Sequence, residues 1–145
     1  MKKQEIYALL NQNPVFHLAT LEGNQPRVRG MLLYRADEDG ILFHTAAMKP
    51  VYQQMRENPK VELCFWDMKQ NLQVRVSGSV ETVEDKALKD EIYEHPSRAF
   101  LKGWKENGAL EDFYNSVVVL RLRHGEATSW TMETNFTEKA PVYLD

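Results

Sequence analysis

The sequence lacks the features that mark several common classes of protein. It has a single cysteine, Cys64, among its 145 residues, so it can form neither an internal disulfide nor a cysteine-based metal site. No segment approaches the roughly 20 consecutive apolar residues that a membrane helix needs. Residues 1–6 also lack the apolar stretch of a signal peptide. These absences predict a soluble cytoplasmic protein that makes no use of a membrane.

An excess of charge of one sign is also missing. The formal net charge is −3 and the sequence pI is about 5.8, so no overall basic field favours non-specific nucleic-acid binding. We therefore expect no nucleic-acid partner. At this length, residues 1–145 are predicted to form a single domain.

The signature motifs of several reaction classes are absent as well. The chain has no Gly-x-Gly-x-x-Gly after a strand, no Walker loop, no His-Glu-x-x-His and no nucleophile elbow. The histidines show no close metal-ligand spacing, and we expect ordinary strand or surface residues at His17, His44, His95 and His124. No metal site is predicted.

Hydrophobic periodicity predicts many strands and few helices. An amphipathic helix opens the chain with Ile6, Leu9 and Leu10 on one face, and Asn13-Pro14 ends it. Apolar alternation predicts strands at 15–21, 27–34, 41–45, 61–67, 72–83 and 117–123, the last continuing with an interruption toward residue 130. Further helices are predicted from Pro50 to the break at Asn58-Pro59, and over 85–94 and 96–107.

The connections between these strands indicate the fold class. The first three strands follow one another through short turns, whereas a doubly wound α/β fold needs a helix after almost every strand. The strand at 72–83 is long enough to curl. We therefore predict a mainly β fold, a six-stranded antiparallel Greek-key split barrel with peripheral helices, in which closure removes exposed strand edges.

Cationic and hydroxyl residues gather between Arg27 and Lys49. Lys49-Pro50 opens a helix, whose first turn presents unpaired backbone N–H groups and a partial positive charge. Thr45, Lys49 and an arginine, Arg27 or Arg29, would complete a cradle for a phosphate group. Solvent-facing strand arginines and a surface lysine would give the same pattern, so the residues alone leave both interpretations open.

Five stretches add a likeness that spans nearly the whole chain. They are residues 13–20 (NPVFHLAT), 23–29 (GNQPRVR), 42–50 (LFHTAAMKP), 57–63 (ENPKVEL) and 72–78 (LQVRVSG). In this order and spacing, the sequence resembles the pyridoxamine 5'-phosphate oxidase-like FMN-binding split barrels. The resemblance implies FMN as the cofactor.

The resemblance also implies which residues bind the flavin. The second strand would run along the cofactor, with Arg29 as the best match for the phosphate arginine. The same strand would contribute Arg27, Gly30, Met31 and Leu32.

Further matches lie on three other segments. His44-Thr45 resembles the family's aromatic-threonine pair, Lys49 its phosphate lysine, and Gln73 a glutamine that contacts the flavin. Met48 stands where a second cation often precedes that lysine, which implies a greater dependence of the phosphate on the two arginines and Thr45.

Proteins with this pattern are generally homodimers with two flavins at the interface, so the resemblance implies a homodimer here. Trp130 is the candidate for a contact with the partner's flavin. A tryptophan packed on the barrel or in the interface would look the same, and packing is the role expected for Trp66 and Trp104.

The implied function is that of an FMN-dependent oxidoreductase, a flavin reductase that uses NAD(P)H on a small-molecule substrate. The flavin would supply the redox chemistry, so no catalytic acid or base is assigned. The chain ends soon after Trp130, where the vitamin B6 oxidases carry a further substrate-binding segment, so pyridoxamine 5'-phosphate oxidase activity itself is not expected. The alternatives are a non-catalytic flavin-binding or stress-sensing module, a deazaflavin-dependent enzyme, a barrel for another phosphorylated ligand and, through His124, a haem-using relative.

Overall fold

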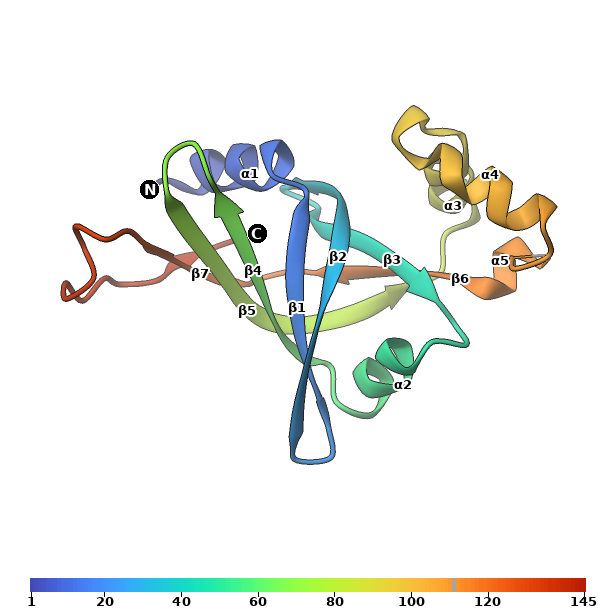
Figure 1. Cartoon of the computed structure of the whole chain (residues 1–145), viewed down its shortest axis with the longest axis horizontal. Coiled ribbons are helices and arrows are strands. Elements are labelled where there is room, and N and C mark those ends of the chain that lie inside the picture. Colours follow the sequence, from blue (N-terminus) through green and yellow to red (C-terminus); the bar gives the residue numbers. More distant parts are fainter. Residues whose placement is uncertain (111) are drawn as a thin grey trace.

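The computed structural model describes residues 1–110 and 112–145 and shows a barrel of antiparallel strands with helices outside it (Figure 1). The barrel strands are β1 (Val15–Glu22), β2 (Gln25–Asp37), β3 (Gly40–Ala46), β4 (Lys60–Asp67), β5 (Leu72–Val83) and β6 (Val117–Leu122). They pair in the order β1-β2-β3-β6-β5-β4, and β4 pairs again with β1. The prediction of a six-stranded antiparallel barrel is confirmed.

The remaining elements lie outside the closed barrel. β7 (Glu126–Trp130) pairs with β5, and β8 (Val142–Tyr143) pairs with β7. The helices are α1 (Lys3–Gln12), α2 (Pro50–Glu57), α3 (Lys86–Glu94), the 3-10 turn η1 (Pro96–Arg98), α4 (Ala99–Glu106) and α5 (Phe113–Ser116). α3, η1, α4 and α5, called the helical segment below, gather at the end of the molecule opposite β7 (Figure 1).

β5 closes the barrel because its two halves pair with different neighbours. Its residues 72–79 pair with β4, and residues 80–83 pair with β6. Figure 1 shows the strand curving beneath the barrel between these partners. Such bending lets one strand belong to both sides of the sheet, as its length predicts.

Three phenylalanines from three strands form the centre of the barrel core. Phe16, Phe43 and Phe65 are fully buried. The Phe16 ring stacks on Phe65 with 4.8 Å between centroids and meets Phe43 edge to face at 5.5 Å, which are the favoured geometries of aromatic pairs. α1 covers this core with the apolar face expected from the sequence: Ile6, Leu9 and Leu10.

A second core attaches the helical segment to the outside of β3 and β6. Leu42 and Val119 on the strands pack with Ile92, Leu101 and Phe113 on the helices, all of them buried. Because side chains alternate along a strand, β3 serves the barrel core with one face and the helical segment with the other.

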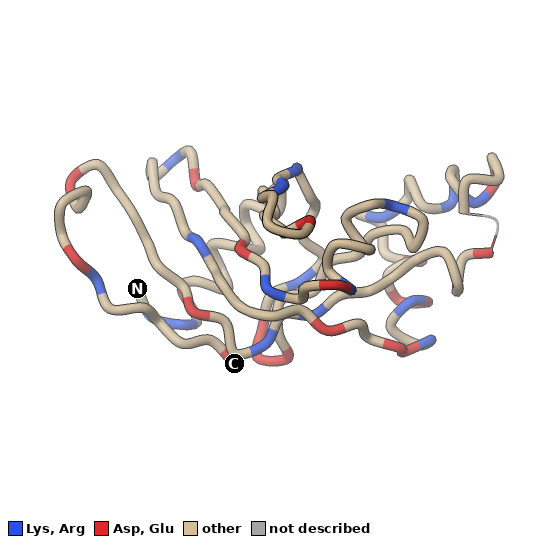
Figure 2. Tube along the Cα trace, turned by 90° about the horizontal axis from the view of Figure 1, so that it is seen from below, with Lys and Arg blue, Asp and Glu red and all other residues tan. Residues whose placement is uncertain are grey.

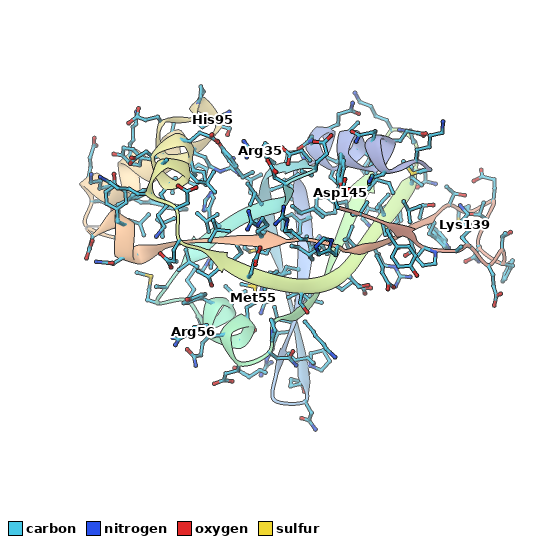
Figure 3. All side chains as sticks on the ribbon, turned by 180° about the vertical axis from the view of Figure 1, so that it is seen from behind. Arg35, Met55, Arg56, His95, Lys139 and Asp145 are labelled. Atoms are coloured by element: carbon cyan, nitrogen blue, oxygen red, sulfur yellow. The ribbon has the colours of Figure 1, made fainter. Side chains whose placement is uncertain are left out.

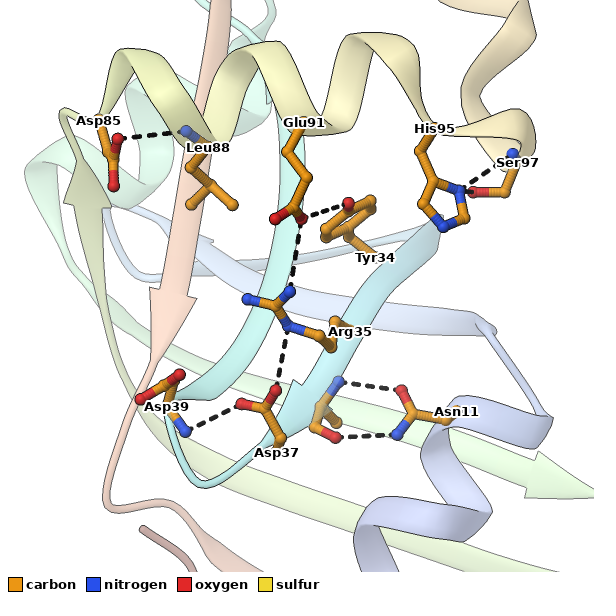
Figure 4. Close-up of polar contacts among 11 residues, drawn as sticks. Asn11, Tyr34, Arg35, Asp37, Asp39, Asp85, Leu88, Glu91, His95 and Ser97 are labelled. Carbon is orange, nitrogen blue, oxygen red and sulfur yellow. Dashed lines mark hydrogen bonds and ion pairs between the residues drawn. The ribbon is translucent and has the colours of Figure 1, made fainter.

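Polar contacts hold α3 against β2 (Figure 4). The Tyr34 hydroxyl donates to Glu91 Oε2 at 2.5 Å, and Arg35 Nη1 lies 3.4 Å from the same oxygen. Burial and Glu91 raise the pKa of Tyr34 to about 12, so this phenol remains a donor at neutral pH.

The structure differs from the predicted boundaries mainly around β2. The sequence predicts a turn over 22–26, whereas the strands continue to a two-residue turn at Gly23-Asn24, where Gly23 supplies a positive φ of 62°. β2 also runs on to Asp37. It holds one extra residue against β3 between Leu33 and Arg35, an irregularity of the kind that re-aims side chains.

Basic and acidic residues are interspersed along the trace (Figure 2). Among the helices within residues 1–110 and 112–145, none has the length and apolar character needed to cross a membrane.

Gly40, in the β2–β3 turn, is expected to tolerate no side chain. Its φ is 116°, and a Cβ would lie 2.8 Å from Arg121 Cγ and 3.0 Å from the Leu122 carbonyl oxygen. Gly40→Ala should lower the free energy of unfolding by about 2–3 kcal/mol, measured by urea denaturation. Gly23→Ala, whose Cβ would meet no atom within 4 Å, is the control and should cost about 1 kcal/mol. If Gly40→Ala and Gly23→Ala lower the free energy of unfolding equally, the positive φ alone determines both effects and the contacts of the Gly40 Cβ contribute nothing.

Candidate functional site

A cavity of about 220 Å³ lies between β2, β3 and the helical segment. The strands and the link to α2 contribute Gly30, Met31, Leu32, His44, Thr45, Ala46 and Lys49. The helical side and the start of β6 contribute Phe100, Leu101, Trp104, Leu110 and Val117. Six of the ten cofactor residues predicted from the sequence therefore meet at one cavity.

Gly30 leaves one wall of this cavity without a side chain. A Cβ built at Gly30 meets no atom within 4 Å, so the backbone of β2 is open to the cavity there. Glycine at such a place permits close approach of a ligand to the strand.

Thr45 presents a polar atom that the described part of the chain leaves unsatisfied. Its residue is 7% exposed, and its Oγ1 is buried without a hydrogen-bond partner among the described residues. Buried hydroxyls are nearly always paired. Thr45 is among the residues that line the cavity, but its Oγ1 has almost no exposed surface of its own, so a ligand oxygen could pair with it only after the side chain turns toward the cavity.

His44, beside Thr45, is held by an arginine from the helical segment. Arg98 Nε donates to His44 Nε2 at 2.9 Å, and this nitrogen must therefore carry a lone pair, which leaves the imidazole proton on Nδ1. Burial, reinforced by the Arg98 charge, lowers the pKa of His44 to about 4. The imidazole is thus neutral at physiological pH, with Nδ1–H as its remaining donor.

Lys49 stands at the start of α2, where it is the N-cap residue and Pro50 follows at the first helical position. Its side chain is exposed, and it forms no hydrogen bond or ion pair within residues 1–110 and 112–145. The ammonium group and the positive end of the helix are available to an anion. Of the first backbone groups, Pro50 has no N–H, and the N–H groups of Lys49 and Tyr52 already donate to the carbonyls of Ala46 and Lys49.

Arg27 and Arg29 lie outside the cavity lining. Arg27 pairs with Glu22 at 2.9 Å on the exposed end of the β1–β2 hairpin. Arg29 donates to the Leu18 carbonyl at 3.1 Å, to Thr20 Oγ1 at 2.8 Å and to Gln54 Oε1 at 2.6 Å. Gln54 belongs to α2, so Arg29 connects the barrel wall to the helix whose start bears Lys49. Their contact with a phosphate stays a prediction.

Gln73 and Trp130 lie in a different part of the molecule. They pair directly across β5 and β7, and the Trp130 ring meets Trp66 edge to face at 6.1 Å. β7 and the helical segment lie at opposite ends of the molecule. In Figure 3, Lys139 marks the loop after β7 and His95 marks the helical segment. Within one chain, the predicted residues therefore form two separate groups. The Lys49 group is the set of six that line the cavity, and the Trp130 group is Gln73 and Trp130.

The sequence interpretation missed the contribution of the helical segment. Arg98, Phe100 and Leu110 carried no motif, and Trp104 was expected to pack, whereas it is 48% exposed at the cavity wall. The Phe100 and Trp104 rings lie 4.9 Å apart, one helical turn along α4. That spacing was the one available signal for a shared aromatic face.

The fold is a split barrel, and the hydrogen-bond donors at its cavity suit an anionic ligand. Comparison with known proteins gives the family: the sequence model of the family described as pyridoxamine 5'-phosphate oxidase matches residues 3–129. The chain belongs to the pyridoxamine 5'-phosphate oxidase family, and the resemblance found in its sequence is confirmed.

Individual relatives agree with this assignment. The pyridoxine/pyridoxamine 5'-phosphate oxidase of Nostoc sp. (strain PCC 7120) is 33% identical over 106 residues, which cover 72% of this chain and 50% of that protein. The chain thus spans about half the length of the curated relatives that it matches.

Solved structures share the fold. A NimC/NimA family protein from Clostridium acetobutylicum has a TM-score of 0.72 at 24% identity, covering 98% of this chain and 91% of its own. A pyridoxamine 5'-phosphate oxidase-related, FMN binding protein from Nostoc punctiforme has a TM-score of 0.68 at 18% identity, with coverages of 92% and 86%.

The buried, neutral His44 makes stability depend on pH. Its pKa is about 4 in the folded chain and about 6.5 when unfolded, so between these values the unfolded chain binds the extra proton. Stability should therefore be fully present above pH 6.5 and fall by about 3 kcal/mol as the pH drops to 4. Urea denaturation at several pH values measures this slope.

His44→Gln removes the titrating group and should flatten the slope in that window. His17→Gln, at an exposed position of β1, is the matched control and should retain it. An unchanged slope in His44→Gln would show that another group dominates the pH dependence.

Proposed function

We propose that this protein is an FMN-binding oxidoreductase that takes electrons from NAD(P)H and passes them to a small-molecule substrate. The observation that carries the proposal is a single cavity lined by Lys49, His44 and the open backbone of Gly30. Thr45 also lines it, and the buried Thr45 hydroxyl has no hydrogen-bond partner among the described residues. Membership of the family and the FMN-binding relative from Nostoc punctiforme support FMN as the ligand.

The residues at the cavity fit the parts of FMN. Lys49 and the start of α2 would hold the phosphate, since a helix N-terminus and an ammonium group both attract anions. Thr45 and the His44 Nδ1–H would donate to ligand oxygens, and Gly30 to Leu32 would line the cofactor along β2. When bound, the flavin supplies hydride and electron transfer, while the protein supplies position and electrostatics.

We further propose that the protein is a homodimer whose two flavin sites each combine the Lys49 group of one copy with the Trp130 group of the other. The cavity of about 220 Å³ is smaller than the roughly 300–1,000 Å³ of typical ligand pockets, so one chain encloses only part of a ligand. The loop after β7 exposes Met132 at 64% and Phe136 at 98%, which favours an apolar partner surface at that end.

Flavin binding is tested with the Lys49→Ala variant. Loss of a charge-assisted hydrogen bond costs about 1.5–3 kcal/mol, so the Kd for FMN should rise by about one to two decades, measured by quenching of flavin fluorescence. Riboflavin, which lacks the phosphate, should bind both proteins equally. Lys60→Ala, an exposed lysine at the start of β4, is the control. A wild-type protein that binds no FMN would overturn the proposal.

The redox half of the proposal has its own readout. The FMN complex should bleach when NADH or NADPH is added without oxygen, and an electron acceptor should restore its absorbance. Tight FMN binding without bleaching by NADH or NADPH would contradict the oxidoreductase proposal and indicate a non-catalytic flavin-binding module.

The shared site is tested by mixing two variants. Lys49→Ala and Trp130→Ala should each weaken FMN binding alone. After unfolding together and refolding, random pairing leaves about one site in four with both residues intact, so a matching fraction of high-affinity sites should reappear in an FMN titration. No recovery from the mixture would place the whole site within one chain.

A further inference from the structure

Arg98 is a buried charge next to the cavity, in contact with the lining residue His44. It is 2% exposed and ends the 3-10 turn η1, just before α4. Arginine is almost never fully buried without a partner of opposite charge. The acceptors of its hydrogen bonds among the described residues are nevertheless uncharged: His44, Ser97 and the Leu33 carbonyl.

The Arg98 guanidinium joins three parts of the fold. Nε donates to His44 on β3, and Nη2 donates to the Leu33 carbonyl at 2.7 Å, beside the extra residue of β2. The Tyr34 and Phe100 rings lie 5.3 and 5.9 Å from its central carbon, within the range of cation–π attraction.

The turn that carries Arg98 is itself fixed. Arg98 Nη1 donates to Ser97 Oγ at 3.0 Å. The Ser97 backbone N–H in turn donates to His95 Nδ1 at 3.1 Å, a contact that Figure 4 shows. The guanidinium is therefore held in one orientation before any ligand arrives, which is the condition for a preorganised site.

This arrangement decides what His44 offers to the cavity. An arginine N–H can only donate, so the His44 Nε2 lone pair is fully used and the imidazole remains neutral with its proton on Nδ1. Within the described residues, Nδ1 has no hydrogen-bond partner, and His44 lines the cavity. The Arg98 charge lies next to the same imidazole ring, on its Nε2 side.

We propose that Arg98 is a positioning residue of the cavity: it holds His44 as an Nδ1–H donor and adds an uncompensated positive charge, so that this donor binds a phosphate oxygen of the ligand. The proposal rests on the proposed FMN site and extends it to the helical segment. Lys49 and the start of α2 contribute positive potential from the link after β3, and Arg98 contributes it through His44.

The tautomer of His44 is the first test, because it needs no flavin. Histidine-labelled protein without ligand should show His44 in the Nδ1–H form by the nitrogen and carbon shifts of its ring. Arg98→Met should lose this preference, and Arg98→Lys should keep part of it. Arg35→Met is the matched control, since Arg35 also contacts Tyr34 and α3 but not His44, and should retain the wild-type tautomer.

Ligand affinity is the second test. Arg98→Met should raise the Kd for FMN about tenfold and leave the Kd for riboflavin unchanged. In a His44→Leu background, the same substitution should cost little further affinity, because Arg98 acts through His44. Competition with inorganic phosphate should weaken in Arg98→Met to the same extent as FMN binding.

The outcomes separate the two proposals. If the wild-type protein binds neither flavin, the proposed cofactor fails, while the tautomer of His44 in the ligand-free protein still decides the positioning role of Arg98. An Nδ1–H preference that survives unchanged in Arg98→Met would overturn the positioning role. Equal losses for FMN and riboflavin would overturn the phosphate contact.

Discussion

The pairing of β5 with both β4 and β6 is the constraint on which the rest of the structure depends. Because β5 serves both sides, the sheet closes around the three central phenylalanines, and no barrel strand has to expose an edge. Closure also fixes which face of β3 points outward. That outer face receives the helical segment, so the cavity forms where β2, β3 and α4 meet.

Much of this was accessible from the sequence because it follows from local patterns. Alternation along 72–83 gave the long strand, and Lys49-Pro50 gave a helix start beside Thr45. Six residues that the sequence singled out on β2, β3 and the link to α2 line one cavity. The contacts of the Arg29 side chain could not be predicted from the sequence, because a strand residue on that face can meet solvent, a ligand or a packed helix. In the structure it meets Gln54 of α2.

The contribution of Arg98 shows where sequence reasoning ends. Its contacts join residues 54 and 65 positions away, so they exist only after the helical segment has docked on β3. No local pattern separates such an arginine from the exposed cations around it in α3 and α4. The two-residue strand β8 is likewise below the length at which alternation is informative.

The energetics of Arg98 argue that this part of the fold serves binding more than stability. Burying a guanidinium costs several kcal/mol after relaxation, and neutral acceptors offset this less completely than a carboxylate would. An apolar side chain packed between Tyr34 and Phe100 would fill the same space without that cost. Proteins accept local destabilisation mainly where function requires it. A positive charge that no carboxylate cancels, placed behind a neutral donor at a cavity, is useful when the missing negative charge arrives with the ligand.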